Sequence, residues 1–190
     1  WERLQSYHDG HYPSDGEVIL DTDGRRVLAL DPPLDVAKLG PVPGPAPGVS
    51  RIADYATDGR WIIFQGETVD GADAATFEQV YAVEQDGKQL RSDTTMSFAR
   101  DKTFVYHGKQ RIAGADPGSF ALISYNLCRN PPAAIEFDSN QVEIGGGWVG
   151  VDRRRAWEVT FVGVKELSVD VAGLQALHDD LRKAATVSAS

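Results

Sequence analysis

Apolar and polar residues alternate in short stretches along most of this chain, and Gly, Asp or Pro separates one stretch from the next. Residues 61–64 and 104–106 are two such apolar stretches, and each is followed two residues later by a glycine. Short β-prone stretches that end in turn-forming residues are typical of β-hairpins. The carboxyl end differs, because Leu174, Leu177 and Leu181 recur at helical spacing and predict an amphipathic α-helix.

A motif of an aromatic residue, two variable residues and Asp precedes these stretches. Its copies end at Asp15, Asp58 and Asp101, and each copy is 43 residues from the next. Equal spacing indicates a tandem repeat in which every unit forms the same local structure. An Asp at this place favours a turn, because its carboxylate can accept hydrogen bonds from nearby backbone N–H groups.

A second Asp follows each predicted hairpin. Asp73 and Asp116 are again 43 residues apart, and each is followed by Ala or Pro, which is a typical start of a short helical turn. In the first copy we assign this position to Asp31, which precedes Pro32 and Pro33. The residues after the turn are again β-prone, so we expect the turn to be brief.

A fourth, more divergent copy runs from Val149 through Asp152 and Gly163 to Asp170, where the turn continues into the predicted helix. We therefore expect a mostly β (α+β) fold of tandem β-hairpin repeats with short helical turns and one carboxy-terminal α-helix. The predicted organisation is a single domain, residues 1–190, with four repeats, a Pro-rich loop and an insert. The repeats lie at about 12–40, 55–80, 98–123 and 149–177, the loop at 41–48 and the insert at 129–148.

The third copy resembles a known family. It reads Phe98-Ala-Arg-Asp-Lys102, then Thr-Phe-Val-Tyr-His-Gly108-Lys, then Gly114-Ala-Asp-Pro-Gly-Ser-Phe120. This order is similar to that of the DKNYY repeats of bacteria, and the resemblance covers nearly the whole chain, from about residue 12 to residue 177. The resemblance implies a repeat protein that is secreted, lipid-anchored or located in the envelope, and it implies no established set of catalytic residues.

Composition narrows the classes of partner. Of 190 residues, 42% are hydrophobic and 25% are charged, as in ordinary globular proteins. The net charge is −9 and the one basic cluster is residues 153–155, so we expect no nucleic-acid partner. No apolar run reaches the ~20 residues of a membrane-spanning helix. The chain begins at Trp1, and we expect that an upstream segment was removed, either a signal sequence with or without a lipid anchor, or an artificial boundary.

Candidate catalytic and metal-binding groups are few. The Asp residues recur at turn positions, which favours a structural role over catalysis or calcium binding. His8 and His11 are close in sequence but lack the spacing of a zinc motif, and Cys128 and the Ser residues lie in no nucleophile motif. We therefore expect a protein without enzymatic activity, metal or cofactor. An acid-dependent hydrolase that uses paired Asp and Glu is an alternative.

The two places where the period breaks are the predicted functional segments, because insertions in repeat proteins form surface loops that often bind partners. In the insert at 129–148, residues 135–144 predict an extra hairpin. The residues predicted to contact a protein partner are Glu136, Asp138, Asn140, Gln141 and Trp148. An inert surface hairpin is the alternative.

Small size, acidic charge and the repeats favour a protein-binding module of the bacterial cell envelope or periplasm. Within this class, the leading hypothesis is an immunity or inhibitor protein that neutralises a bacterial toxin or effector by direct binding. The alternative is a structural or anchored surface repeat protein that acts as a spacer or in adhesion.

Overall fold

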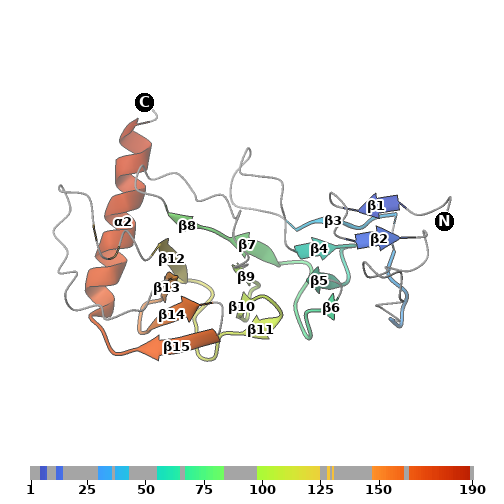
Figure 1. Ribbon diagram of the computed structural model, residues 1–190, viewed down its shortest axis with the longest axis horizontal. Helices are drawn as coiled ribbons and strands as arrows, with labels where there is room; N and C mark the ends of the chain where they lie inside the picture. The colour runs from blue at the N-terminus through green and yellow to red at the C-terminus, as the bar shows by residue number, and fades with distance from the viewer. Residues whose placement is uncertain are drawn as a thin grey trace. The chain divides into compact units, whose positions relative to one another are not determined.

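The computed structural model describes part of the chain, and the structural statements below refer to that part. The described residues are 5–7, 12–14, 30–35, 37–42, 55–64, 67–83, 98–124, 128, 130, 147–160 and 163–188. The chain divides into two compact units, Trp1–Gln79 with Ser97–Arg111 and Val80–Met96 with Ile112–Ser190. The division falls inside one strand, β7 (Glu78–Val80), and we describe each unit by itself (Figure 1).

The first unit contains three small sheets. One is the antiparallel pair of β1 (Gln5–Tyr7) and β2 (Tyr12–Ser14). The other two are four-stranded, with the orders β3-β4-β5-β6 and β7-β9-β10-β11. The bounds of these strands are Gly40–Pro41 for β3, Tyr55–Thr57 for β4, Ile62–Phe64 for β5, Glu67–Thr68 for β6, Phe98–Arg100 for β9, Val105–His107 for β10 and Gln110–Arg111 for β11.

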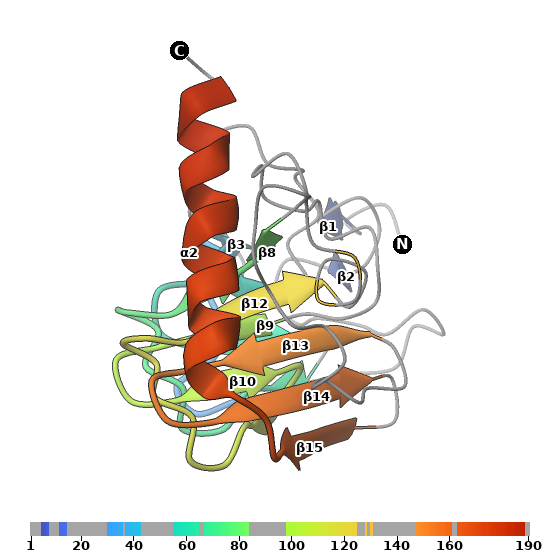
Figure 2. The same ribbon diagram turned by 90° about the vertical axis from the view of Figure 1, so that its left-hand side faces the viewer.

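The second unit contains one five-stranded sheet and the carboxy-terminal helix α2 (Val171–Ser188). The sheet order is β15-β14-β13-β12-β8, in which β8 runs parallel to β12 and the other neighbours are antiparallel. The strand bounds are Ala82–Val83 for β8, Ala121–Ser124 for β12, Trp148–Val151 for β13, Ala156–Thr160 for β14 and Gly163–Leu167 for β15. Helix α2 packs against β8, β12 and β13, as Figure 2 shows.

The fold class expected from the sequence is confirmed, since the described chain is mostly β with a helix at its carboxyl end. The prediction of a two-stranded hairpin in each copy is incomplete. Each hairpin supplies the second and third strands of a three-stranded antiparallel meander. The motif that ends at Asp58 or Asp101 itself forms the first strand, β4 or β9, and in the fourth copy the residues before Asp152 form β13. The first two of these strands have three residues, too few for an alternating pattern to show in the sequence.

Each meander receives a fourth strand from the segment that precedes it in the chain. β3 lies beside β4, β7 beside β9, and β12 beside β13. β3 also corrects the expected boundary of the Pro-rich loop. Pro41 lies in this edge strand, where its missing N–H costs no ladder hydrogen bond, and the N–H of Val42 donates to the carbonyl of Tyr55 at 3.3 Å. Residues 43–48 of that loop lie outside the described part.

Aromatic side chains fill the core of the first unit. The ring of Phe77 lies between Tyr55 and Tyr106, with centroid distances of 5.1 and 5.3 Å. The hydroxyl of Tyr55 donates to the carbonyl of Gly108 at 2.7 Å. Gly108 has a φ of 56°, which a tight hairpin requires and which a glycine adopts without strain. These contacts join the two four-stranded sheets of this unit.

Helix α2 covers the core of the second unit. Leu174, Leu177 and Leu181 are each 1% exposed or less, which confirms the expected apolar face. They pack with Ile123 and Val149 of the sheet, and each buried Leu contributes about 1.5–3 kcal/mol relative to exposure. The helix starts as expected, after Asp170, whose Oδ1 accepts the N–H of Ala172 at 3.1 Å.

Candidate functional site

Three aspartates, one at the first turn of each described meander, make the same set of hydrogen bonds. They are Asp58, Asp101 and Asp152, and we call them the staple aspartates. In each, Oδ1 accepts the backbone N–H groups two and three residues later, at 2.6 to 2.8 Å. These bonds close the tight turn between the first and second strands of the meander.

The second carboxylate oxygen of each staple aspartate reaches an earlier part of the chain. It accepts the backbone N–H of another Asp, at 2.8 to 3.0 Å. The donors are Asp35 to Asp58, Asp73 to Asp101 and Asp116 to Asp152, and we call Asp35, Asp73 and Asp116 the turn aspartates. The staple aspartates therefore join each meander to the turn that precedes it, by a bond that depends on the backbone of the turn rather than on its side chains.

The turn aspartates hold their own turns in the same way in successive copies. Asp73 Oδ1 accepts the N–H of Ala75, and Asp116 Oδ1 accepts the N–H of Gly118, both at 3.1 Å. The backbone closes each turn with one bond to the carbonyl of the turn aspartate, from the N–H three residues later. The expected short helical turns are thus single hydrogen-bonded turns.

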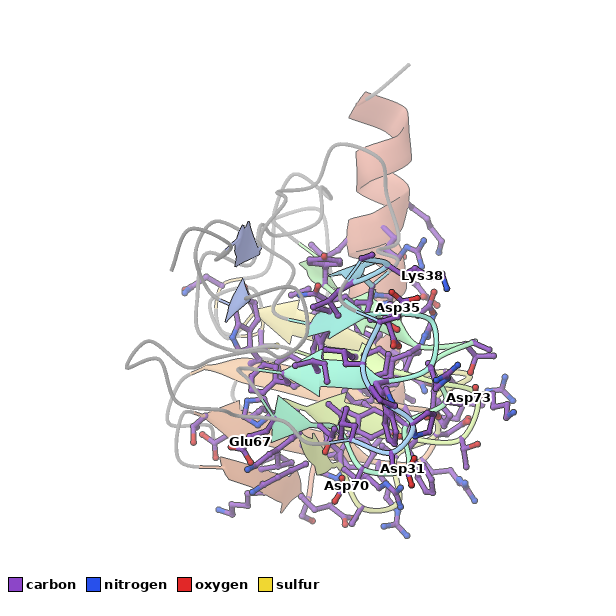
Figure 3. The ribbon with its side chains drawn as sticks, turned by 90° about the vertical axis from the view of Figure 1, so that its right-hand side faces the viewer. Asp31, Asp35, Lys38, Glu67, Asp70 and Asp73 are labelled. Carbon is purple, nitrogen blue, oxygen red and sulfur yellow. The ribbon has the colours of Figure 1, made fainter. Side chains whose placement is uncertain are left out.

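The first copy corrects our assignment of Asp31, because Asp35 is the residue that occupies the turn position. The N–H of Asp35 donates to Asp58, and its carbonyl accepts the N–H of Lys38 at 3.0 Å, as in the other copies. Asp31 is exposed and lies apart from Asp35 (Figure 3). The Asp-Pro-Pro sequence suggested a helix start, but no Ala or Pro directly follows Asp35, so the motif gave no sign of the true turn.

A hydroxyl group supports two of the three junctions. The N–H of Lys102 donates to Thr76 Oγ1 at 3.1 Å, and the N–H of Arg153 donates to Ser119 Oγ at 3.3 Å. In the first junction the corresponding turn residue is Lys38, which has no hydroxyl. The N–H of Gly59 there donates instead to Thr57 Oγ1, at 2.9 Å. The same backbone donor is thus satisfied at all three junctions by different residues.

The staple aspartates of the first unit are held in their charged form. Burial opposes ionisation of Asp58 and Asp101, but the surrounding donors outweigh it, so the pKa of each carboxyl lies below its usual value. For Asp101 the donors include the hydroxyl of Tyr106, at 2.7 Å from Oδ2. Burial and this carboxylate together raise the pKa of Tyr106 above its usual value. Asp101 is 4% exposed and Asp152 is fully buried, so both act as internal acceptors.

Cations lie beside two of the turn aspartates. Lys38 Nζ is 2.6 Å from Asp35 Oδ2, and Lys102 Nζ is 2.5 Å from Asp73 Oδ2. These lysines are the main reason that the pKa of each carboxyl is lowered, whereas for Asp116 the main cause is a hydrogen bond from the hydroxyl of Ser119. Asp35 and Lys38 lie side by side in Figure 3, and Asp73 lies in the next turn of the same unit.

The meanders give each sheet two different ends. We call the end with the staple aspartate the locked end, and the end where the first meander strand begins the loop end. The chain enters β4, β9 and β13 at the loop end. The segments that lead to these strands are residues 42–54, 84–97 and 125–147, and they differ in length. The loop end of each sheet thus receives a connecting segment of a different length.

Of the residues predicted to contact a partner, Trp148 is the one that lies in the described part. It begins β13 at the loop end, is half-buried, and pairs with Ser124 of β12 and Val159 of β14. Glu136, Asp138, Asn140 and Gln141 lie outside the described residues, as do His8 and His11.

Among the described residues, Cys128 is buried, and His107 and His178 are partly buried. Burial raises the pKa of the Cys128 thiol to about 12 and lowers the pKa of His107 and His178. Within the described ranges, no group of three or more His, Cys, Asp and Glu side chains lies close enough together to hold a metal ion. No helix among the same residues is both long and apolar enough to span a membrane.

Comparison with known proteins adds no relative. No family model, no curated protein and no solved structure matches the chain. The resemblance to the DKNYY repeats therefore stays a prediction. The staple aspartates are the recurring structural feature of the chain, so a DKNYY repeat of known structure should show the same turn if the prediction is right.

Proposed function

We propose that this chain is a protein-binding module of the bacterial cell envelope, and that it acts as an immunity or inhibitor protein that neutralises a toxin by direct binding. The observation that carries this proposal is the difference between the two ends of each sheet. The same hydrogen bonds recur at the locked end, whereas the loop end carries connecting segments of different length. A constant scaffold with variable loops at one end is the usual construction of a recognition surface.

The titratable groups of the scaffold support binding rather than catalysis. Asp101 accepts four hydrogen bonds, from Thr103, Phe104, Tyr106 and Asp73. Both of its oxygens are therefore occupied, and the carboxylate has no free position from which to accept a proton from a substrate. The repeated acidic residues thus hold the scaffold together.

The charge of the insert supports a basic partner. Residues 129–148 contain Glu136, Asp138 and Glu143 against the single basic residue Arg129, within a chain of net charge −9. Acidic residues on a recognition surface steer a basic protein toward it and raise the association rate. A secreted toxin with a basic surface fits this charge.

The test is direct binding between the purified chain and the product of the gene next to its own, measured by calorimetry and by protection of cells that express that product in the periplasm. The expected result is a stable complex and survival. The variant Glu136→Lys with Asp138→Lys should weaken binding at least tenfold. A matched control, Asp179→Lys on the exposed side of α2, should bind within twofold of the unchanged chain. No binding and no protection would leave the anchored spacer as the better account.

A further inference from the structure

β15 is an unusually long edge strand for this fold. It has five residues, whereas β6 and β11, which take the same place in the sheets of the first unit, have two residues each. Very short edge strands protect a sheet against pairing with other chains. β15 ends the order of its sheet, and no described strand pairs with its outer side.

The register of the sheet shows which backbone groups of β15 point outward. The N–H of Asp152 donates to the carbonyl of Arg155, which directs the backbone groups of Arg155 toward β13. Because directions alternate in antiparallel pairs, those of Glu158 point toward β15, where this residue faces Lys165. The N–H and C=O groups of Val164 and Glu166 therefore point away from β14, toward the open edge.

The side chains of β15 continue two rows that cross the sheet. Val164 lies in register with Val159 and Trp148, so that an apolar row reaches the edge, where Val164 is 37% exposed. Lys165 lies opposite Glu158 on the other face of the sheet. Both Lys165 and Glu166 are exposed, and the half-exposed guanidinium of Arg155 lies 3.4 Å from Glu166 Oε2. The edge thus presents a fixed series of apolar, basic and acidic side chains.

We propose that the outer edge of β15 is a docking site for an extended segment of a protein partner, which adds to the sheet as an antiparallel strand. The chemistry of the edge sets the sequence of that strand. Opposite Glu166, Lys165 and Val164 it carries a cation, a carboxylate and an apolar residue, in this order along the partner chain. This inference rests on the proposed function, because it names a surface through which the binding module engages its partner.

A second copy of this chain fits the edge poorly. Two chains related by a two-fold axis would place Lys165 opposite Lys165, Glu166 opposite Glu166, or Val164 opposite Val164. Like charges face each other directly in the first two registers, which destabilises the pair. The third register leaves the charges of Lys165 unmatched, opposite Gly163, and it brings together two chains of net charge −9. A partner strand of a different sequence satisfies all three positions.

The experiment uses the full chain and a synthetic probe, the blocked peptide Thr-Thr-Arg-Glu-Val-Thr-Thr, followed by NMR titration and amide hydrogen exchange. The peptide should shift the amide signals of Val164 and Glu166 and slow their exchange at least tenfold. The amide of Lys165, which already faces β14, should keep its exchange rate. A control peptide with Arg and Glu exchanged should bind at least tenfold more weakly. Absence of any change at these two amides at millimolar peptide, or equal binding of the two peptides, would overturn the proposal.

The variant Val164→Pro separates this proposal from the proposed function. It removes one outward N–H from an edge position that a proline can occupy, and urea unfolding checks that the chain stays folded. The variant should lose the effect of the peptide and bind the product of the neighbouring gene at least tenfold more weakly. If the variant binds that protein as tightly as the unchanged chain does, β15 is not the site although the proposed function stands. If the unchanged chain binds the peptide but not that protein, the proposed function fails and the docking edge remains.

Discussion

The replacement Asp101→Asn tests the energy of a staple aspartate. The carboxylate of Asp101 accepts the backbone N–H groups of Thr103 and Phe104 at 2.6 and 2.7 Å on Oδ1. On Oδ2 it accepts the hydroxyl of Tyr106 at 2.7 Å and the backbone N–H of Asp73 at 3.0 Å. Asn keeps one oxygen for the local turn but places an NH₂ group where the second oxygen was. The Tyr106 hydroxyl can rotate and accept from this group, whereas the N–H of Asp73 loses its acceptor.

The expected loss of unfolding free energy is about 2–3 kcal/mol, which is one charge-assisted hydrogen bond together with a donor left unsatisfied in a partly buried site. Asp101→Ala removes all four acceptor contacts and should cost roughly 3–5 kcal/mol. The assay is urea unfolding followed by tryptophan fluorescence and circular dichroism.

Two control variants show whether the loss of stability is specific to the Asp101 carboxylate. Tyr106→Phe removes one of the four donors and should cost about 1 kcal/mol. Asp70→Asn changes an exposed carboxylate that accepts a hydrogen bond from Thr68 at 3.1 Å, and it should cost less than about 0.5 kcal/mol. If Asp101→Asn unfolds within about 0.5 kcal/mol of the unchanged chain, the staple contributes no stability and the reasoning is wrong.

Three further predictions follow from the same structure. The pKa values of the staple aspartates in the first unit lie below the usual 3.8, so their contribution to the free energy of unfolding is complete above about pH 4 and is lost as the pH falls through the lowered values. The free energy of unfolding should therefore fall less steeply with decreasing pH in Asp101→Asn than in the unchanged chain. Parallel curves of unfolding free energy against pH would contradict this. Gly71→Ala should cost about 1–2 kcal/mol, because φ is 67° and the new Cβ would displace the guanidinium of Arg111, which donates to the carbonyl of Asp70 at 2.9 Å. Gly59→Ala, with φ of 87° and open space, should cost less, because it displaces no side chain; equal losses in urea unfolding would show that the displacement of Arg111 costs nothing. Cys128, whose pKa is raised to about 12 by burial, should react with a maleimide at pH 8 only as fast as the chain unfolds, and rapid labelling of the folded chain would show that the thiol is accessible.

Much of the fold followed from the sequence, because the signals were periodic. The equal spacing of Asp58 and Asp101, and of Asp73 and Asp116, marked the turns, and the Leu residues of α2 marked the helix. The short strands β4 and β9 were missed, since three residues carry no pattern and their place is fixed by pairing with distant strands.

The staple bonds themselves could not be found by periodicity. The paired residues are 23, 28 and 36 positions apart in the three copies, because the connecting segments differ in length. The donor is also a backbone N–H, which leaves no trace in the residue type. The same fact explains the error at Asp31, since the position of Asp35 is set by its bond to Asp58 rather than by a sequence motif.

The most direct test of the junction described here is site-resolved amide hydrogen exchange in Asp101→Asn and Asp152→Asn. Each turn N–H is bonded by one particular staple aspartate, so the account predicts faster exchange at Asp73 in the first variant and at Asp116 in the second. The other turn should keep its protection in each case. Unchanged exchange at both turns, or faster exchange at the turn that the altered residue does not contact, would contradict the account.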